Sequence, residues 1–234
     1  REPVQHDEIL AGELRIEVDL SDKRVAVIGT GATAVQLITE ISKNISQLTV
    51  FQRTPNYCKP LRNSRIDDAT QAALRRDQAE IFRKCRESYG AFIYDFDPRS
   101  AFDVSDEERL AIYERLWAEP GFGFWLGNFS DMLRDRAANE TIAEFVRQKI
   151  RERVKDPAVA ALLTPTDHAF GTKRVPLESG YYEAFNRENV KLVDMRATPI
   201  ERITRSGIVT SAAEFEFDII IFATGFDAAT GAHK

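Results

Sequence analysis

The chain has 234 residues, of which 43% are hydrophobic and 29% charged, and it carries a net charge of −5. A chain of this length and composition can fold around a sizeable core. Its acidic balance argues against a nucleic-acid partner. It holds no apolar run of the roughly 20 residues that a membrane span needs, so we expect no membrane association and a cytoplasmic location.

The cysteines and histidines give no support for a metal site. Cys58 and Cys85 lie far apart, and the three histidines, His6, His168 and His233, are equally scattered. Zinc sites place Cys and His at short, regular spacings, and none occurs here. We therefore predict no metal and interpret the thiols as structural or incidental.

The first clear element after a polar lead-in, in which residues 13–18 alternate like a short edge strand, is an apolar strand over residues 24–28. It runs directly into Gly29-Thr30-Gly31-Ala32-Thr33-Ala34, and helical apolar spacing follows over about 33–42. Such a strand, glycine turn and helix are typical of a dinucleotide-binding βαβ unit. Gly29 permits the tight turn and Gly31 lets the backbone approach a pyrophosphate, which then accepts from the helix N-terminus. The alternative is a purely structural glycine turn.

A second strand over residues 48–51 leads to Arg53 and Thr54. NAD-selective sites place an acidic residue about 20 positions beyond the glycines, where it accepts from the ribose 2′-hydroxyl. Here Arg53 stands 53 − 31 = 22 residues beyond Gly31. A guanidinium suits a 2′-phosphate, so the sequence favours NADP over NAD; the alternative is a solvated arginine at a strand end.

Residues 63–165 switch to a mostly helical pattern. A first helix is predicted to begin at Asp67 or Asp68, with apolar residues on one side as far as Tyr89. Ser105 and Glu108 form a capping box for a second helix, and Asn139 is predicted to cap a third helix that ends at Asp156-Pro157. Between the last two, residues 120–127 form a loop of glycine and aromatic residues, which we expect to pack in the core rather than line a pocket.

After Pro165 the alternation of strands and helices resumes. Residues 170–176 form a loop that carries the adjacent cations Lys173 and Arg174, and on charge alone a solvated basic pair is the simplest interpretation. The later elements are a helix over 180–185, a strand over 190–194, a hairpin over 199–210, an alternating segment over 214–217, and a continuous apolar strand over 218–223. The last strand is typical of one buried on both faces of a parallel sheet, and it ends in Thr224-Gly225-Phe226.

These elements predict an α/β fold, a Rossmann-like three-layer nucleotide-binding domain with a parallel sheet, a small antiparallel β element and a large helical insertion. We assign residues 1–62 to the first part of the Rossmann domain, 63–165 to the helical insertion, and 166–234 to the second part of the Rossmann domain.

Taken together, the motifs resemble those of the flavin-dependent Baeyer–Villiger monooxygenases, a branch of the class B flavoprotein monooxygenases, and in particular those acting on bulky or cyclic ketones, including steroid and large-ring types. The resemblance covers nearly the whole chain from about Asp19. The matching segments, in chain order, are Gly29 to Gln36, Phe51-Gln52-Arg53-Thr54-Pro55, Ala138-Asn139-Glu140, Thr172-Lys173-Arg174, Tyr181 to Val190, and Asp218 to Asp227.

The resemblance implies a role for each matching residue. It makes Arg174 the catalytic arginine, which lies over the flavin and holds the negative charge that develops on flavin-bound oxygen. A permanent cation stabilises developing anionic oxygen most strongly in a dry site. The residues that would contact NADP(H) are Gly29, Thr30, Gly31, Ala32, Thr33 and Gln36 at the pyrophosphate, with Arg53, Thr54 and Lys173 at the 2′-phosphate.

Two departures from the family indicate that the chain is a domain of a longer enzyme. Residues 1–20 contain neither Phe nor Trp, so the family's signature ahead of the glycine turn has no match, and the first FAD-binding glycine motif is absent. We therefore expect this domain to bind NADP(H), and a missing FAD domain to pack on it. The parent enzyme would use NADPH, FAD and O2 to insert oxygen beside a ketone carbonyl, giving an ester or lactone, and the 234-residue chain alone would be inactive.

Two alternatives stay open. The parent can be a class B enzyme that oxygenates nitrogen or sulfur, in which Arg174 would be dispensable. The chain can also be a non-catalytic NADP-sensing module whose helical insertion binds a protein partner.

Overall fold

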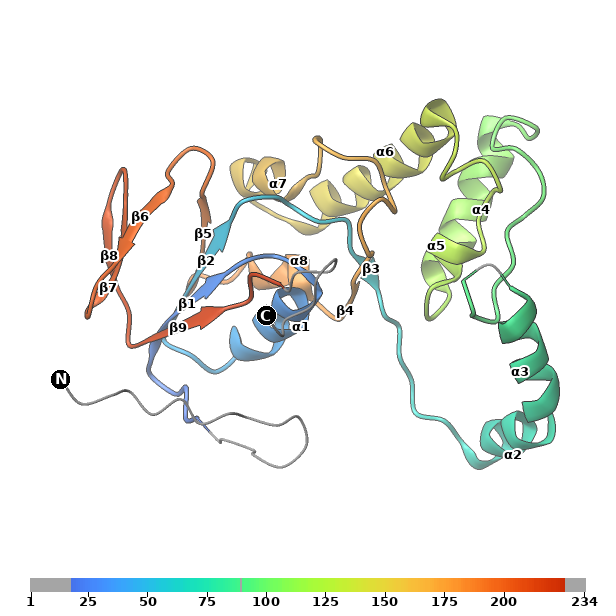
Figure 1. The fold of residues 1–234 in the computed structure, drawn as a ribbon, viewed down its shortest axis with the longest axis horizontal. Helices are drawn as coiled ribbons and strands as arrows, with labels where there is room; N and C mark the ends of the chain where they lie inside the picture. Colours follow the sequence, from blue (N-terminus) through green and yellow to red (C-terminus); the bar gives the residue numbers. More distant parts are fainter. Residues whose placement is uncertain (1–17, 89, 226–234) are drawn as a thin grey trace, which may run out of the picture.

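The computed structural model describes residues 18–88 and 90–225. At its centre lies a four-stranded parallel sheet in the order β5-β2-β1-β9 (Figure 1). Its strands are β1 (Arg24–Ile28), β2 (Gln47–Gln52), β5 (Val190–Asp194) and β9 (Ile219–Phe222). Strands from both ends of the chain thus meet in one sheet, as the sequence predicts.

Different layers cover the two faces of the sheet, because successive side chains of a strand point to opposite faces. On one face, Val25 and Val27 of β1 pack in a buried cluster with α1 (Ala32–Ile41). The same cluster includes residues of α6 (Arg136–Arg153), α7 (Pro157–Leu163) and α8 (Tyr181–Ala184). On the other face, Ala26 and Ile28 pack against a small antiparallel sheet. That sheet contains β6 (Ile200–Ile203), β7 (Gly207–Thr210) and β8 (Glu214–Glu216). This confirms the predicted three-layer fold.

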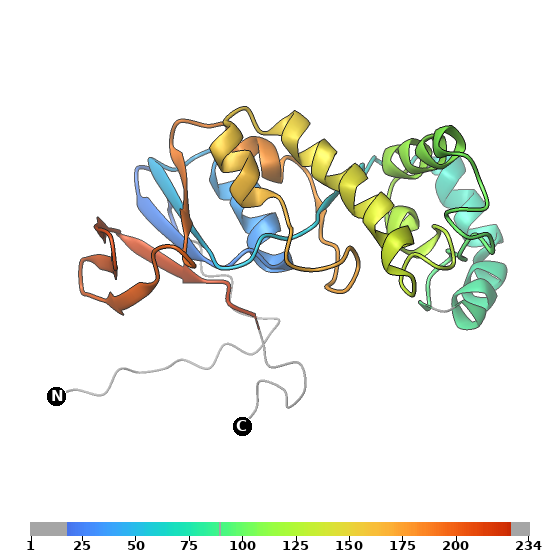
Figure 2. The same ribbon diagram turned by 90° about the horizontal axis from the view of Figure 1, so that it is seen from above.

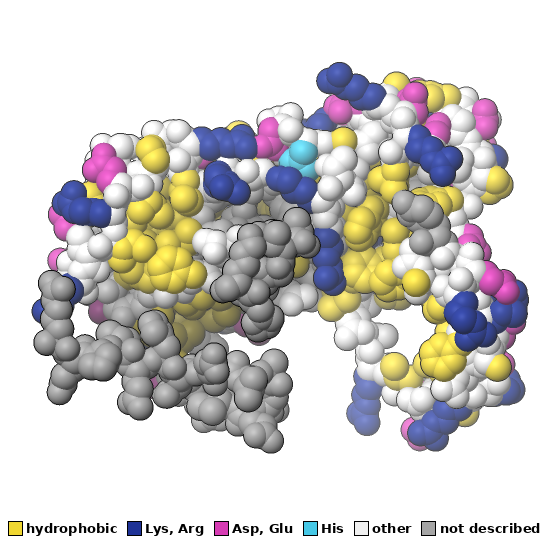
Figure 3. Space-filling model, viewed as in Figure 1, with side chains coloured by type: hydrophobic (Ala, Val, Ile, Leu, Met, Phe, Trp, Pro, Cys, Tyr) yellow, Lys and Arg dark blue, Asp and Glu magenta, His cyan; other side chains and the backbone are white. Residues whose placement is uncertain are grey.

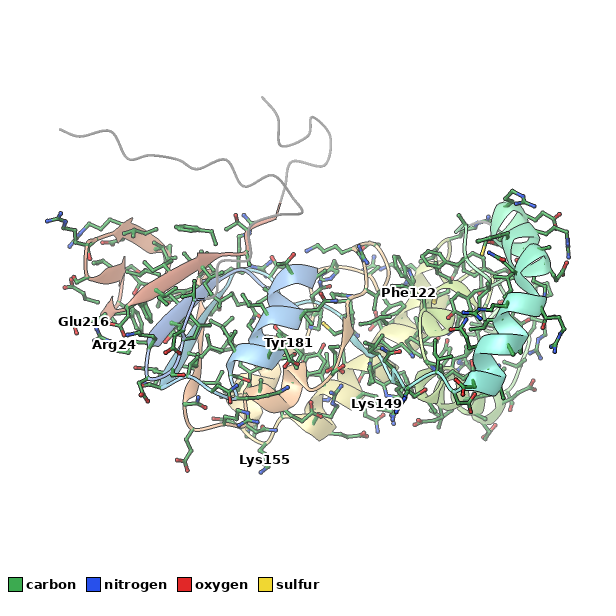
Figure 4. The ribbon with its side chains drawn as sticks, turned by 90° about the horizontal axis from the view of Figure 1, so that it is seen from below. Arg24, Phe122, Lys149, Lys155, Tyr181 and Glu216 are labelled. Atoms are coloured by element: carbon green, nitrogen blue, oxygen red, sulfur yellow. The ribbon has the colours of Figure 1, made fainter. Side chains whose placement is uncertain are left out.

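Arg24, at the start of β1, connects the central sheet to the small antiparallel sheet through side-chain hydrogen bonds. Its guanidinium donates to Asp218 (3.0 Å from Nη2) and to Glu216 (2.7 Å from Nη1), and Figure 4 shows Arg24 beside Glu216 at one end of the molecule. The hydrogen bonds from Arg24 lower the pKa of Asp218 to about 2. The start of β9 is therefore held next to β1 by charge as well as by backbone pairing.

Most of the helical region extends away from the sheet, and the long helix α6 links the two (Figure 2), whereas α7 packs against the sheet. Its core is aromatic: the fully buried Phe124 contacts Tyr113, Trp117, Phe145 and Phe170. The helices of this region are α2 (Asp68–Arg76), α3 (Gln78–Glu87), α4 (Asp106–Ala118), α5 (Gly123–Leu126), α6 (Arg136–Arg153) and α7 (Pro157–Leu163). The burial of Phe124 confirms that the segment of glycine and aromatic residues packs in the core, although part of it is the short helix α5 rather than a loop.

A buried ion pair connects the end of α6 to a separate two-stranded sheet. The side chain of Glu178 is 0% exposed and lies 2.8 Å from Arg153 at the end of α6. Glu178 belongs to β4 (Leu177–Glu178), which pairs in parallel with β3 (Lys59–Pro60), and its carboxylate also accepts from the first backbone groups around α8 (Tyr181–Ala184). Burial opposes the charge of Arg153, but the carboxylates of Glu183 and Glu178 raise its pKa above the usual value.

The helical boundaries differ from the prediction at two places. The single helix predicted from Asp67 is divided at Asp77 into α2 and α3, because Asp competes for local hydrogen bonds and favours helix ends. Asn139 does not cap α6; Asp135 does, by accepting from the N–H of Ala138 (2.8 Å). The predicted cap at Ser105 is confirmed, since its side chain accepts from the N–H of Glu108 (3.2 Å).

The last strand is less buried than predicted. β9 joins the parallel sheet through β1, but it forms the edge of the described sheet, and Phe222 is 63% exposed. Three further short elements, β3, β4 and α7, were not predicted. Tyr89, Phe226 and the segment 13–17 of the predicted edge strand lie outside the described residues. Among the described helices, none combines the length and the apolar character needed to cross a bilayer.

Phe124→Ala should lower the free energy of unfolding by about 3–5 kcal/mol, because it leaves a cavity at the centre of the aromatic core. The matched control is Phe82→Ala on α3, where the side chain is 53% exposed, and there the change should stay within about 0.5 kcal/mol. Urea unfolding of both variants measures the difference. Equal losses would mean that the aromatic cluster is not the stabilising core of the helical region.

Candidate functional site

Gly29 occupies a position that no other residue fits. It follows β1 with φ at +117°, in the region that favours glycine, and its N–H donates to Phe51 at the end of β2 (3.0 Å). A Cβ at this position would lie 2.3 Å from the carbonyl oxygen of Ala223, which follows β9. The turn after β1 therefore lies between the carboxyl ends of β2 and β9, the two strands that flank β1.

The two residues after Gly29 have different tasks. Thr30 is 6% exposed, and its hydroxyl donates to the carbonyl of Thr54 (2.7 Å), which ties the glycine turn to the segment after β2. Gly31 is the N-cap of α1, with no side-chain cap and no acidic residue in the first turn. A Cβ on Gly31 would meet no atom of residues 18–88 or 90–225 within 4 Å. Within this part of the chain, the positive end of α1 consequently faces open space beside the turn.

A cavity of about 250 Å³ lies over this edge of the sheet. It brings together six of the predicted site residues, which come from three separate segments of the chain. Its lining residues are Ile28, Gly29, Thr30, Gly31, Phe51, Arg53, Thr54, Pro55, Asn56, Lys173, Met195, Ala223 and Thr224. The glycine turn, the strand-end arginine and the loop lysine thus share one cavity.

Four predicted site residues do not line the cavity. Ala32 and Thr33 lie in the first turn of α1, and Gln36 lies further along it with its side chain exposed. Arg174 is exposed in the loop before β4, next to Lys173. The structure therefore separates the two adjacent cations: Lys173 borders the cavity and Arg174 does not.

Two cations, Arg53 and Lys173, line the cavity. Within residues 18–88 and 90–225, Arg53 and Lys173 form no ion pair, and Figure 3 shows Lys and Arg side chains gathered along the upper middle of this face of the molecule. A third cation, Arg196, is paired with Asp167. His168, which donates to Asp167 (2.7 Å), and then Arg196 lower the pKa of Asp167 to about 2. Asp167 is therefore an anion at neutral pH.

Asn139 positions the loop that carries Lys173. Its amide donates to the carbonyls of Met132 and Phe170 (both 2.8 Å) and accepts from the N–H of Phe170 (2.9 Å). The side chain is 6% exposed, so these bonds replace those that water would otherwise supply. The predicted helix cap is thus an anchor between α6 and the loop at 170–176.

Sequence reasoning missed Met195 and Asn56 as lining residues, and Arg196 as their charged neighbour. Met195 directly follows β5, which pairs in parallel with β2. The carboxyl ends of parallel strands meet at one edge, where ligands bind in such sheets. Recognising that the strand over 190–194 neighbours β2 would have pointed to Met195 and Arg196.

Comparisons with known proteins identify homologues. No protein-family model matches the chain. It is 50% identical over 214 residues to the 2-oxo-Delta(3)-4,5,5-trimethylcyclopentenylacetyl-CoA monooxygenase of Pseudomonas putida, covering 92% of this chain and 39% of that protein. It is 44% identical over 216 residues to a Baeyer-Villiger monooxygenase of Pseudooceanicola batsensis, with the same coverage.

Solved structures agree. The crystal structure of OTEMO in complex with FAD and NADP superimposes with a TM-score of 0.89 at 50% identity, covering 91% of this chain and 39% of that one. The chain is thus homologous to Baeyer–Villiger monooxygenases, and it spans about two fifths (39%) of the length of these relatives.

Two glycine substitutions should distinguish a glycine that the fold requires, Gly29, from one that only leaves space beside the helix N-terminus, Gly31. Gly29→Ala should destabilise the chain by several kcal/mol, because it places a methyl group against the Ala223 carbonyl and strains the backbone at positive φ. Gly31→Ala should change the free energy of unfolding by less than about 1 kcal/mol, since φ is −76° and the added carbon meets open space. Thermal melting of both variants checks this; a large loss for Gly31→Ala would contradict the open geometry.

Proposed function

We propose that this chain, as a homologue of part of the Baeyer–Villiger monooxygenases, is the NADP(H)-binding domain of such an enzyme. One observation carries the proposal: the cavity joins an uncapped helix N-terminus to two cations that have no ion-pair partner among the described residues. These cations come from segments 120 residues apart (173 − 53 = 120). The homologous OTEMO structure holds both FAD and NADP.

The residues present fit a dinucleotide. A pyrophosphate would lie at the start of α1, where the N–H groups have no side-chain cap and the position beside Gly31 is open. Thr30 would not contact it directly through its hydroxyl, because that group is committed to Thr54. Gln36 would contact the nucleotide only along the exposed side of α1.

The 2′-phosphate would lie between Arg53 and Lys173. Arg53 supplies a planar fork that matches phosphate oxygens, and Lys173 supplies a compact charge from the opposite segment. Thr54 lines the same cavity, and its hydroxyl can donate as well. A carboxylate in place of Arg53 would repel this phosphate, so the arrangement selects NADP(H) over NAD(H).

Arg174 is proposed as the catalytic arginine of the parent enzyme. Its side chain is exposed beside the cavity and has no ion-pair partner among the described residues. FAD, bound largely by the rest of the parent, would supply the chemistry that activates O2 for insertion beside a ketone carbonyl. The task of Arg174 would be to hold developing negative charge on oxygen, which a fixed cation does best where water is excluded.

The domain organisation fits the same proposal. Residues 1–62 and 166–234 would form the two parts of the nucleotide-binding domain, with 63–165 inserted between them. β9 lies at the edge of the described sheet, and its exposed Phe222 offers an apolar surface for a packed FAD domain.

The other two functions make different use of the same site. An enzyme that oxygenates nitrogen or sulfur would bind NADP(H) identically but would not need Arg174. A sensing module would bind NADP(H) and use the exposed side chains of α2 and α3, which bury no residue, for a partner. Flanking FAD-domain sequence in the gene would exclude the module.

NADPH should bind more tightly than NADH to the 234-residue chain. Arg53→Ala and Lys173→Ala should each weaken NADPH about tenfold or more, because a charge-assisted contact is worth about 1.5–3 kcal/mol, and should leave NADH almost unchanged. Calorimetric titration of both nucleotides measures the effect. Equal weakening of NADPH and NADH would show that these cations do not contact the 2′-phosphate.

Arg174→Ala in the full-length parent should lower the rate of ketone oxygenation by about two orders of magnitude or more, because one preorganised charge-stabilising group typically contributes that much to kcat. Flavin reduction by NADPH should persist. Product formation and flavin absorbance are measured on the same samples. Lactone or ester formation at the rate of the unmodified enzyme would remove Arg174 from the catalytic step and favour an enzyme that oxygenates nitrogen or sulfur.

A further inference from the structure

We propose that Arg196 is a third cation of the 2′-phosphate site and that Asp167 holds it in position; this rests on the proposed NADP(H) site. Arg196 belongs to none of the short motifs on which the resemblance to the monooxygenase family was based. Its place follows from the pairing of strands, and its orientation follows from two side-chain contacts.

The backbone brings Arg196 to the same edge of the sheet as Arg53. β5 pairs with β2 so that Asp194 lies opposite Gln52, and the N–H of Met195 donates to the carbonyl of Gln52 (2.8 Å). Arg53 and Met195 both line the cavity, and each is the first residue beyond its strand. The N–H of Arg196 donates to the carboxylate of Asp194 (2.9 Å), which fixes the turn after β5.

The side chain of Arg196 reaches the cavity wall. Its Nη2 lies 3.2 Å from the hydroxyl oxygen of Thr54, a lining residue proposed to contact the 2′-phosphate. The same nitrogen donates to Asp167. Asp167 is in turn fixed by the hydrogen bond from His168 (2.7 Å), whose side chain is only 11% exposed. Arg196 is thus oriented by a carboxylate that is itself held.

Arg196 keeps unused donors for a ligand. A guanidinium has five N–H groups, and among the described residues neither Nε nor Nη1 of Arg196 has a hydrogen-bond partner. A phosphate beside Thr54 can therefore accept from Arg196 while the pair with Asp167 persists. Without a phosphate, Asp167 neutralises Arg196, so that Arg53 and Lys173 are the cations of the site that have no ion-pair partner within residues 18–88 and 90–225.

The test measures the binding of 2′,5′-ADP and of 5′-AMP to the 234-residue chain by calorimetry, since the two probes differ in the 2′-phosphate. Arg196→Met should weaken 2′,5′-ADP by about threefold to tenfold, the range for a charged contact that is partly screened by solvent, and leave 5′-AMP within about twofold. Arg196→Lys should recover part of the loss. The matched control is Arg83→Met, an arginine of similar exposure that is paired with Glu80 on the distant α3.

Asp167→Asn distinguishes a phosphate contact from a purely structural ion pair. If Arg196 acts on the phosphate, Asp167→Asn should not weaken 2′,5′-ADP, because the amide oxygen of Asn can still accept from Nη2 and hold Arg196, while a nearby negative charge is removed. Weakening as large as that of Arg196→Met, or equal weakening of both probes, would overturn the proposal. Thermal melting confirms that each variant is folded before it is titrated.

The failure of this inference is distinguishable from the failure of the proposed function. Unchanged 2′,5′-ADP binding in Arg196→Met, with weakened binding in Arg53→Ala, removes Arg196 from the site and leaves the NADP(H) site standing. Binding of 2′,5′-ADP no tighter than that of 5′-AMP by the unmodified chain, together with no effect of Arg53→Ala, overturns both.

Discussion

The site depends on one close approach of backbone to backbone. Gly29 passes so near the carbonyl of Ala223 that any side chain on it would collide with that oxygen. This contact joins the first strand to the last, sets the turn that starts α1, and leaves the helix N-terminus facing the cavity. The hydroxyl of Thr30 extends the same constraint to Thr54, and through it to the segment that carries Arg53.

Parallel strand pairing brings cationic side chains together at the site, although they lie far apart in the sequence. Arg53 follows β2 and Arg196 follows β5, and because the two strands are parallel neighbours their carboxyl ends meet. Lys173 arrives on a loop that Asn139 anchors to α6 and that the buried pair of Glu178 and Arg153 fixes on its other side. The helical region therefore supports the site without lining it: its buried polar contacts hold the loop that delivers a cation.

The helical region also shows how uneven the burial is along this chain. The aromatic cluster around Phe124 forms a dense core, while α2 and α3 bury no side chain. At the opposite end, the edge strand β9 leaves Phe222 exposed. For a chain that spans 39% of its relatives' length, surfaces of this kind fit the proposal that further polypeptide packs on the domain.

The sequence alone determined what depends on local chemistry. The strand, glycine turn and helix around Gly29, the cap at Ser105 and the position of Arg53 follow from propensity and fixed spacing, and the structure agrees. The three-layer fold followed from the alternation of these patterns. Only the tertiary structure decided that β9 lies at the edge of the described sheet, that Asn139 anchors a loop instead of capping α6, and that Arg196 reaches Thr54 across 142 positions of sequence. The reason is physical: propensities act over a few residues, whereas strand order and buried polar partners are set by contacts between segments far apart in the chain, which a single sequence does not encode as a local pattern.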